Sequence, residues 1–232
     1  MEARILRERA RAALAGSWGV SIGVAALAAL LGGLLIGSSF LPNISAEFPI
    51  HFPLMEELAA ELEDGIRIGY LTFSLRNGVF GLAAFLIGGT LQLGYAQFLL
   101  KQHDGRDPQF NDLFSQFHRF GTGFAQHFLR GLYVALWSLL FLIPGIIKSY
   151  SYAMTPFILA DQPHMTAGEA IEWSMELMDG HKMDLFVLEL TFLGWEILAG
   201  LTGNLGHLAL NPYQNAARAA FYRQLLAERH HP

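Results

Sequence analysis

The sequence contains no cysteine. This absence excludes disulfide bonds, thiolate metal ligands and a cysteine nucleophile. The sequence also has no glycine-rich phosphate-binding loop and no Gly-x-Ser-x-Gly nucleophile elbow, two motifs that would indicate an enzyme. It therefore gives no positive support for an enzyme, and we expect no cofactor.

Charged residues are scarce as well. They make up 15% of the 232 residues, whereas 53% are hydrophobic, and soluble domains carry about 25% charged residues. The few charges lie between long apolar runs, which is typical of a multi-pass membrane protein. The net charge is −5 and no basic block occurs, so we expect membrane lipids, and not nucleic acid, as partners. A homo-oligomer is left open.

The chain is organised around residues 142–163. One apolar run ends at Pro144-Gly145 and a second run follows at once, which predicts a tight outer turn between two membrane-crossing helices. An earlier run from Trp18 to Leu41 has room for a helix of about 35 Å, enough to cross a hydrocarbon core of about 30 Å. Arginines precede that run and place the N-terminus in the cytoplasm.

One pattern occurs three times along the chain. It consists of an amphipathic helix, a glycine, a membrane span that leaves the cytoplasm, a helix-breaking residue (the breaker) and a span that returns. Amphipathic helices are predicted at 2–15, 110–120 and 165–179, the last capped by Thr166 with Glu169. Each is followed by a glycine, namely Gly16, Gly121 or Gly180. The breakers that follow, Pro42, Pro144 and Gly203, lie about one bilayer crossing further on.

This pattern predicts an all-α, polytopic membrane helical bundle. Six membrane helices form three hairpins, each preceded by an amphipathic interfacial helix, in one integral-membrane domain over residues 1–232. The three units cover about 2–100, 108–161 and 165–227, and an acidic extracytoplasmic insert covers 42–75. Both termini then lie in the cytoplasm of a bacterium, with the chain in its plasma (inner) membrane. A four-span alternative leaves 146–160 and 205–226 on the membrane surface.

Two carboxylates fall within the fifth predicted span, which covers 185–201. Glu189 and Glu196 are seven residues apart, so both face the same side of a helix. A charged carboxylate near the bilayer centre costs roughly 2.5 kcal/mol or more and needs a partner or a proton. The candidate partners are Lys148, Arg130 and Arg218. The two carboxylates then form a proton- or ion-coupled site, belong to a structural ion pair, or lie near the membrane interface.

Two further features belong to a possible ligand pathway. Lys148, with Tyr150 and Tyr152, is either an interface anchor or a ligand contact. Pro156 and Pro212 break predicted membrane helices, as prolines do at some transporter sites. The candidate residues for a ligand or ion pathway are therefore Glu189, Glu196, Lys148, Arg130, Arg218, Tyr152 and Asn211.

Four side chains at the predicted cytoplasmic face have the types that bind divalent metals, namely Asp161, His164, His181 and Asp184. No His-Glu-x-x-His or comparable ligand spacing accompanies them. We therefore do not predict a metal site, and these four remain weak candidates.

Several short motifs between about residues 100 and 226 resemble one bacterial integral-membrane family. They are Ile143-Pro144-Gly145-Ile146-Ile147-Lys148, Pro156-Phe157-Ile158-Leu159-Ala160-Asp161, Gly180-His181-Lys182, Gly194-Trp195 and Leu210-Asn211-Pro212-Tyr213. The family is domain-of-unknown-function family 975, and the resemblance implies a multi-pass membrane protein without established catalytic residues. The sequence departs from the family pattern at Glu196, where an aromatic residue is usual, and at His207, where an apolar residue is.

Three functions are consistent with these features. The first is a non-enzymatic, lipid-embedded scaffold or interaction protein. The second is a small transporter or channel that uses the proline-broken helices and the intramembrane carboxylate Glu189. The third is an intramembrane lipid-modifying enzyme, which would need the four metal-type side chains to converge.

Overall fold

The structure is a computed structural model that describes residues 2–32, 85–140, 142–202 and 206–230. These residues form helices and loops, and no strand occurs among them, which confirms the all-α class. The acidic insert, residues 33–41 of the first predicted span, residues 77–84 of the second and the predicted breakers Pro42 and Gly203 lie outside the described residues. The helices are α1 (Ala3–Leu14), α2 (Trp18–Gly32), an unlabelled helix at 85–103, η2 (Phe110–Phe114), η3 (Phe117–Arg119), α5 (Phe120–Leu140), α6 (Leu142–Ser151), α7 (Thr155–Asp161), α8 (Ala167–Leu177), α9 (Lys182–Leu190), α10 (Leu193–Leu201) and α11 (His207–His230).

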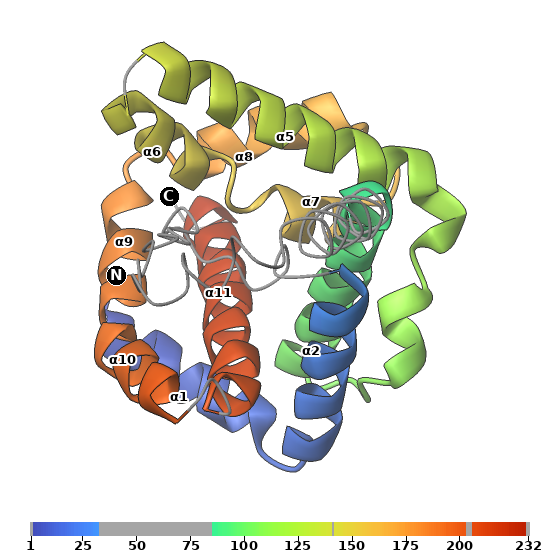
Figure 1. The fold of residues 1–232 in the computed structure, drawn as a ribbon, viewed down its shortest axis with the longest axis vertical. Helices are drawn as coiled ribbons and strands as arrows, with labels where there is room; N and C mark the ends of the chain where they lie inside the picture. Colours follow the sequence, from blue (N-terminus) through green and yellow to red (C-terminus); the bar gives the residue numbers. More distant parts are fainter. Residues whose placement is uncertain (1, 33–84, 141, 203–205, 231–232) are drawn as a thin grey trace, which may run out of the picture.

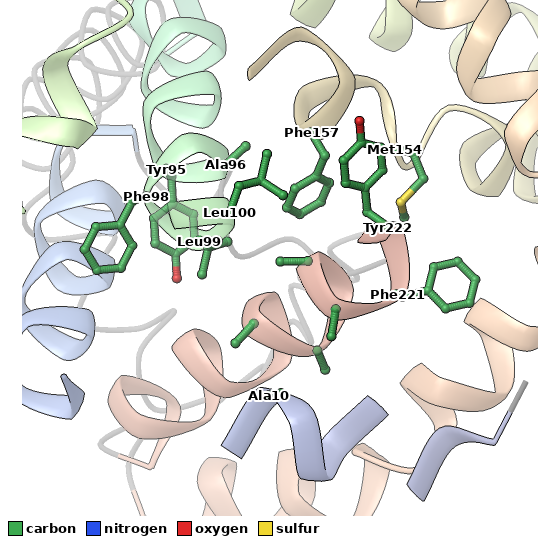
Figure 2. Close-up of a cluster of buried hydrophobic side chains, with 14 of the residues drawn as sticks. Ala10, Tyr95, Ala96, Phe98, Leu99, Leu100, Met154, Phe157, Phe221 and Tyr222 are labelled. Carbon is green, nitrogen blue, oxygen red and sulfur yellow. The ribbon is translucent and has the colours of Figure 1, made fainter. Parts of the chain in front are cut away.

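Helix α11 lies at the centre of the fold (Figure 1). Helices α1, α2, α9 and α10 pack against it. Four buried alanines, Ala216, Ala217, Ala219 and Ala220, let its neighbours approach closely, and Phe221 and Tyr222 are fully buried. Figure 2 shows the Tyr222 ring between Phe157 and Met154, whereas Phe221 points away from them. Because apolar residues surround α11 on most sides, it behaves as a core helix and not as a surface one.

Helices α5, α6 and α8 form one layer at the top of the view in Figure 1. Helix α5 ends at Leu140 and α6 begins at Leu142, so the prediction that Pro144-Gly145 forms the turn is wrong by about three residues. Pro144 instead lies in the first turn of α6, where no backbone N–H is needed. A Cβ on Gly145 would lie 2.1 Å from the Ser138 hydroxyl, so glycine permits the close packing of α5 on α6.

Two predicted membrane spans are each interrupted. The returning segment 146–160 consists of the end of α6 and of α7, with a break at 152–154. Pro156 lies in the first turn of α7 and does not break a helix interior as predicted. The fifth span consists of α9 and α10, separated at Thr191 and Phe192. Pro212 does lie inside a helix, α11.

The amphipathic helices at 2–15 and 165–179 are confirmed as α1 and α8. The Thr166–Glu169 capping box is also present, and hydrogen bonds from Thr166 lower the pKa of the Glu169 carboxyl. Residues 110–119 form two short 3-10 helices in place of the predicted α-helix. The apolar face of α1 packs on α11, so internal packing accounts for the amphipathic pattern that predicts an interfacial helix.

Two of the three glycines that follow the predicted amphipathic helices have the left-handed backbone that favours glycine, and we call each of the three an elbow glycine. Gly16 has a φ of 86° and Gly180 a φ of 80°, and each connects an amphipathic helix to the helix that follows. Gly121 lies in the first turn of α5 instead. Backbone geometry therefore supports the elbow in the first and third units only.

Small residues in the helix at 85–103 allow close contacts with two neighbours. A Cβ on Gly89 would lie 2.1 Å from the carbonyl oxygen of Gly123, and a Cβ on Gly94 would lie 2.0 Å from that of Leu113. The second glycine belongs to the small-xxx-small pattern from Thr90 to Gly94. This pattern therefore serves packing within the chain, against α5 and η2.

By length and composition, no single helix among the described residues meets the requirements for crossing a membrane. The bent pair of Ala3–Leu14 with Trp18–Ala28, whose axes differ by 100°, meets them together.

Candidate functional site

Glu189 lies at the C-terminal end of α9 and connects three helices. Its Oε1 accepts hydrogen bonds from Arg218 of α11, at 2.7 Å from Nη2 and 3.1 Å from Nε. Its Oε2 accepts one from the Tyr150 hydroxyl of α6 at 3.0 Å. The side chains of both ionic partners are 19% exposed. Arg218 is thus the partner among the three basic residues that the sequence suggested.

Arg130 of α5 lies close enough to act electrostatically on both Arg218 and Glu189. It is partly buried. The site therefore contains two guanidinium groups and one carboxylate, and of the two arginines it is Arg218 that donates hydrogen bonds to Glu189.

Glu196 lies in the first turn of α10 and is bound by two residues of α11. His207 Nε2 lies 2.8 Å from its Oε2, and Gln214 donates a hydrogen bond to its Oε1. The other ring nitrogen of His207 is buried without a partner. Gln214 was not predicted, because a glutamine on a neighbouring helix carries no sequence signal of this contact.

The two carboxylates therefore both face α11, even though the helix that carries them is broken between α9 and α10. The break directs Glu189 to Arg218 and Glu196 to His207, eleven residues apart on α11. Glu196 and His207 pair with each other, as expected where a carboxylate on an apolar helix needs a polar partner.

Lys148 is held by aromatic rings and a thioether. Its Nζ lies 5.0 Å from the centre of the Trp137 ring, 6.0 Å from that of Tyr152 and 3.8 Å from the sulfur of Met175 in α8. The prediction placed Lys148 at the outer turn and the helix of Met175 at the cytoplasmic face. Because the two residues touch, these two placements cannot both be correct across a layer of about 30 Å.

The two tyrosines that accompany Lys148 are buried. Tyr150 is 5% exposed and Tyr152 is 3% exposed. Tyr150 binds Glu189, as described above, and the Tyr152 ring contacts that of Tyr133. Their positions favour interior roles over the interface anchoring suggested by the sequence. Asn211 lies in α11, where its backbone carbonyl accepts a hydrogen bond from the side-chain amide of Asn215 at 2.9 Å.

The four weak metal candidates do not converge. Asp161 binds Arg223 and Tyr222, whereas His181 contacts Asp184 at 3.1 Å. Within the described ranges, no three His, Asp or Glu side chains are placed to hold a metal ion.

An ion-pair cluster that the sequence did not reveal lies around Arg223. Its guanidinium binds Asp104, at 2.7 Å from Nη2, and Asp161, at 2.9 Å from Nη1. Arg106 also binds Asp104, at 2.6 Å. Burial raises the pKa of the Asp104 carboxyl, but the hydrogen bonds and charges of the two arginines outweigh this effect and hold that pKa below its usual value. The cluster ties α11 to the end of α7 and to the turn after 85–103.

These contacts define an all-helical protein whose last helix is tied by ion pairs to several others. Residues 139–229 match the model of the family described as "Protein of unknown function (DUF975)", which is the family that the motifs indicated. The matched stretch contains Glu189, Glu196, Arg218 and Arg223. Neither a curated protein nor a solved structure matches the chain.

Proposed function

We propose that this chain is a multi-pass, lipid-embedded protein of the bacterial plasma membrane that acts as a non-enzymatic scaffold or interaction protein. The observation that carries the proposal is a large set of exposed apolar side chains on α5–α6 and α9–α10, which we call the apolar surface. Its members are Phe128, Leu132, Leu136, Trp137, Leu139, Ile143, Ile146, Ile147, Phe186, Val187, Leu190, Leu193, Trp195, Ile197, Leu198 and Leu201.

The exposure of the apolar surface is high for side chains of this size. Leu139 is 82% exposed, Leu201 is 79% exposed and Ile143 is 71% exposed. Soluble monomers rarely expose contiguous apolar patches of more than a few hundred Å². Hydrocarbon would cover these side chains without requiring any polar contact, which is why we favour a lipid environment.

The contacts of the two carboxylates support a structural role more than a transport role. Glu189 accepts three hydrogen bonds from two neighbouring helices, and Glu196 is bound by His207 and Gln214. A carboxylate bound in this way has its charge and its hydrogen-bond acceptors paired in the position it occupies. Ion-coupled transport through Glu189 is the alternative, and it would require this carboxylate to change partners during each cycle.

Reconstitution of the purified chain into liposomes tests the proposal and its alternative together. We expect the chain to remain with the liposomes in flotation after an alkaline carbonate wash, because the apolar surface is then in hydrocarbon. We also expect proton and sodium flux to equal that of empty liposomes. Release by carbonate would contradict the membrane assignment, and flux that is lost in Glu189→Gln would replace the scaffold role with transport.

A further inference from the structure

Helix α1 carries four arginines, and none of them forms a salt bridge within the described part of the chain. Arg9 donates a hydrogen bond to Gln224. The other three, Arg4, Arg7 and Arg11, recur at intervals of three and four residues, so they lie along one face of the helix. This face therefore holds positive charge that no carboxylate of the described residues neutralises by direct contact.

Arg7 and Arg11 converge on a single oxygen atom. Arg7 Nε contacts the Tyr213 hydroxyl at 3.5 Å and Arg11 Nη2 contacts it at 3.3 Å, so the two nitrogen atoms lie within about 7 Å of each other. The hydroxyl lies 3.4 Å from the backbone carbonyl of Arg7, to which it donates its hydrogen. Two positive charges therefore meet at a neutral group.

Aromatic rings fix the orientation of both guanidinium groups. Arg7 lies over the ring of Phe192 at 5.6 Å, and Arg11 lies over the ring of Tyr213 at 5.7 Å. The two rings contact each other edge to face at 5.1 Å, and Phe192 is 2% exposed. A guanidinium over a ring keeps its N–H groups in its own plane, where they remain available to an oxyanion.

The charged groups on the same side of α1 favour an anion. Arg4 lies one turn before Arg7 and adds a third positive charge. Glu8 is exposed and lies on this face too, but it forms no salt bridge with either arginine. Three positive charges and one negative charge leave the face basic.

We propose that Arg7 and Arg11 bind a phosphate group, with Phe192 and Tyr213 supporting them. With nitrogen atoms within about 7 Å of each other, the two guanidinium groups can both donate N–H groups to one phosphate, and arginine binds phosphate oxygens in a bidentate manner. The phosphate belongs either to an anionic lipid headgroup or to a free phosphate-bearing anion. The site does not depend on the proposed function, because its geometry is complete within the chain.

The test is the thermal stability of the full chain in a zwitterionic detergent. The added probes are short-chain phosphatidic acid, short-chain phosphatidylcholine and inorganic phosphate, because a ligand of the folded state raises the melting temperature. We expect phosphatidic acid to raise it and phosphatidylcholine to leave it unchanged. A shift with inorganic phosphate as well assigns the binding to the phosphate group itself, and a shift with the acidic lipid alone assigns it to a lipid headgroup.

The variants separate the site from general charge attraction. Arg7→Gln with Arg11→Gln is expected to weaken the apparent affinity at least tenfold, since charge-assisted hydrogen bonds are lost. Arg9→Gln removes the same charge from the opposite side of α1 and is expected to leave the affinity unchanged. Arg11→Gln changes one exposed side chain and gives a several-fold loss if the double variant does not fold. An unshifted wild type, or an equal loss in Arg9→Gln, would overturn the proposal.

Discussion

Replacing Arg218 with methionine is expected to lower the free energy of unfolding by about 2–4 kcal/mol, since removing one partner of a buried pair leaves the other charge uncompensated. The Glu189 carboxylate would then keep only its hydrogen bond from Tyr150. We expect a value somewhat below the usual loss of about 3–5 kcal/mol for a fully buried pair, because both side chains are 19% exposed. The measurement is helix content by circular dichroism in mixed micelles as the fraction of denaturing detergent rises.

The double variant Glu189→Gln with Arg218→Met provides the internal check. We expect it to be more stable than Arg218→Met alone, because a neutral amide then replaces the carboxylate that has lost its hydrogen-bonded guanidinium. Arg106→Met is the matched control, since Arg106 is 63% exposed in its salt bridge and such pairs contribute little. Equal losses in Arg218→Met and Arg106→Met would show that the Glu189 pair does not tie the helices together.

Replacing Gly94 with alanine is expected to destabilise the fold by about 2–3 kcal/mol, the upper part of the range for overpacking. The new Cβ would lie 2.0 Å from the Leu113 carbonyl oxygen and 2.9 Å from that of Asp112. Both are backbone atoms and cannot rotate away as a side chain can, so the helix at 85–103 must move away from η2. The same unfolding assay in mixed micelles measures the change.

Gly131 offers a matched control in the middle of α5, because nothing lies within 4 Å of the position that its Cβ would occupy. Gly131→Ala is expected to raise the free energy of unfolding by about 0.5–1 kcal/mol through its higher helix propensity. If Gly94→Ala behaved like Gly131→Ala, the close contact of the helix at 85–103 with η2 would not hold in solution.

Local sequence signals predicted the features that depend on few neighbouring residues. The capping box at Thr166 and the elbows at Gly16 and Gly180 are confirmed because each is determined within one turn of the chain. The sequence also predicted that Glu189 pairs with a basic residue, since a carboxylate in an apolar helix needs a partner. The choice of Arg218 from three candidates required the packing of α9 on α11.

Features that depend on tertiary packing were missed or misplaced. The break at Thr191 and Phe192 has no proline or glycine to mark it, and it forms where the Phe192 ring packs against Tyr213. The contact between Lys148 and Met175 joins segments that hydropathy alone had assigned to opposite faces. The Arg223 cluster joins residues 119 positions apart, a separation at which a single sequence carries no pairing signal.

The absence of cysteine makes the most direct test of the apolar surface simple, because any introduced cysteine is unique. Spin labels at Leu139→Cys, Ile143→Cys and Trp195→Cys would be compared, in liposomes, with a label at Glu172→Cys on the exposed, polar side of α8. A lipid-facing apolar surface predicts that the first three labels collide more often with dissolved oxygen than with a water-soluble nickel complex, and that the fourth shows the reverse. Equal access of the nickel complex to all four labels would contradict the proposal that this surface lies in lipid.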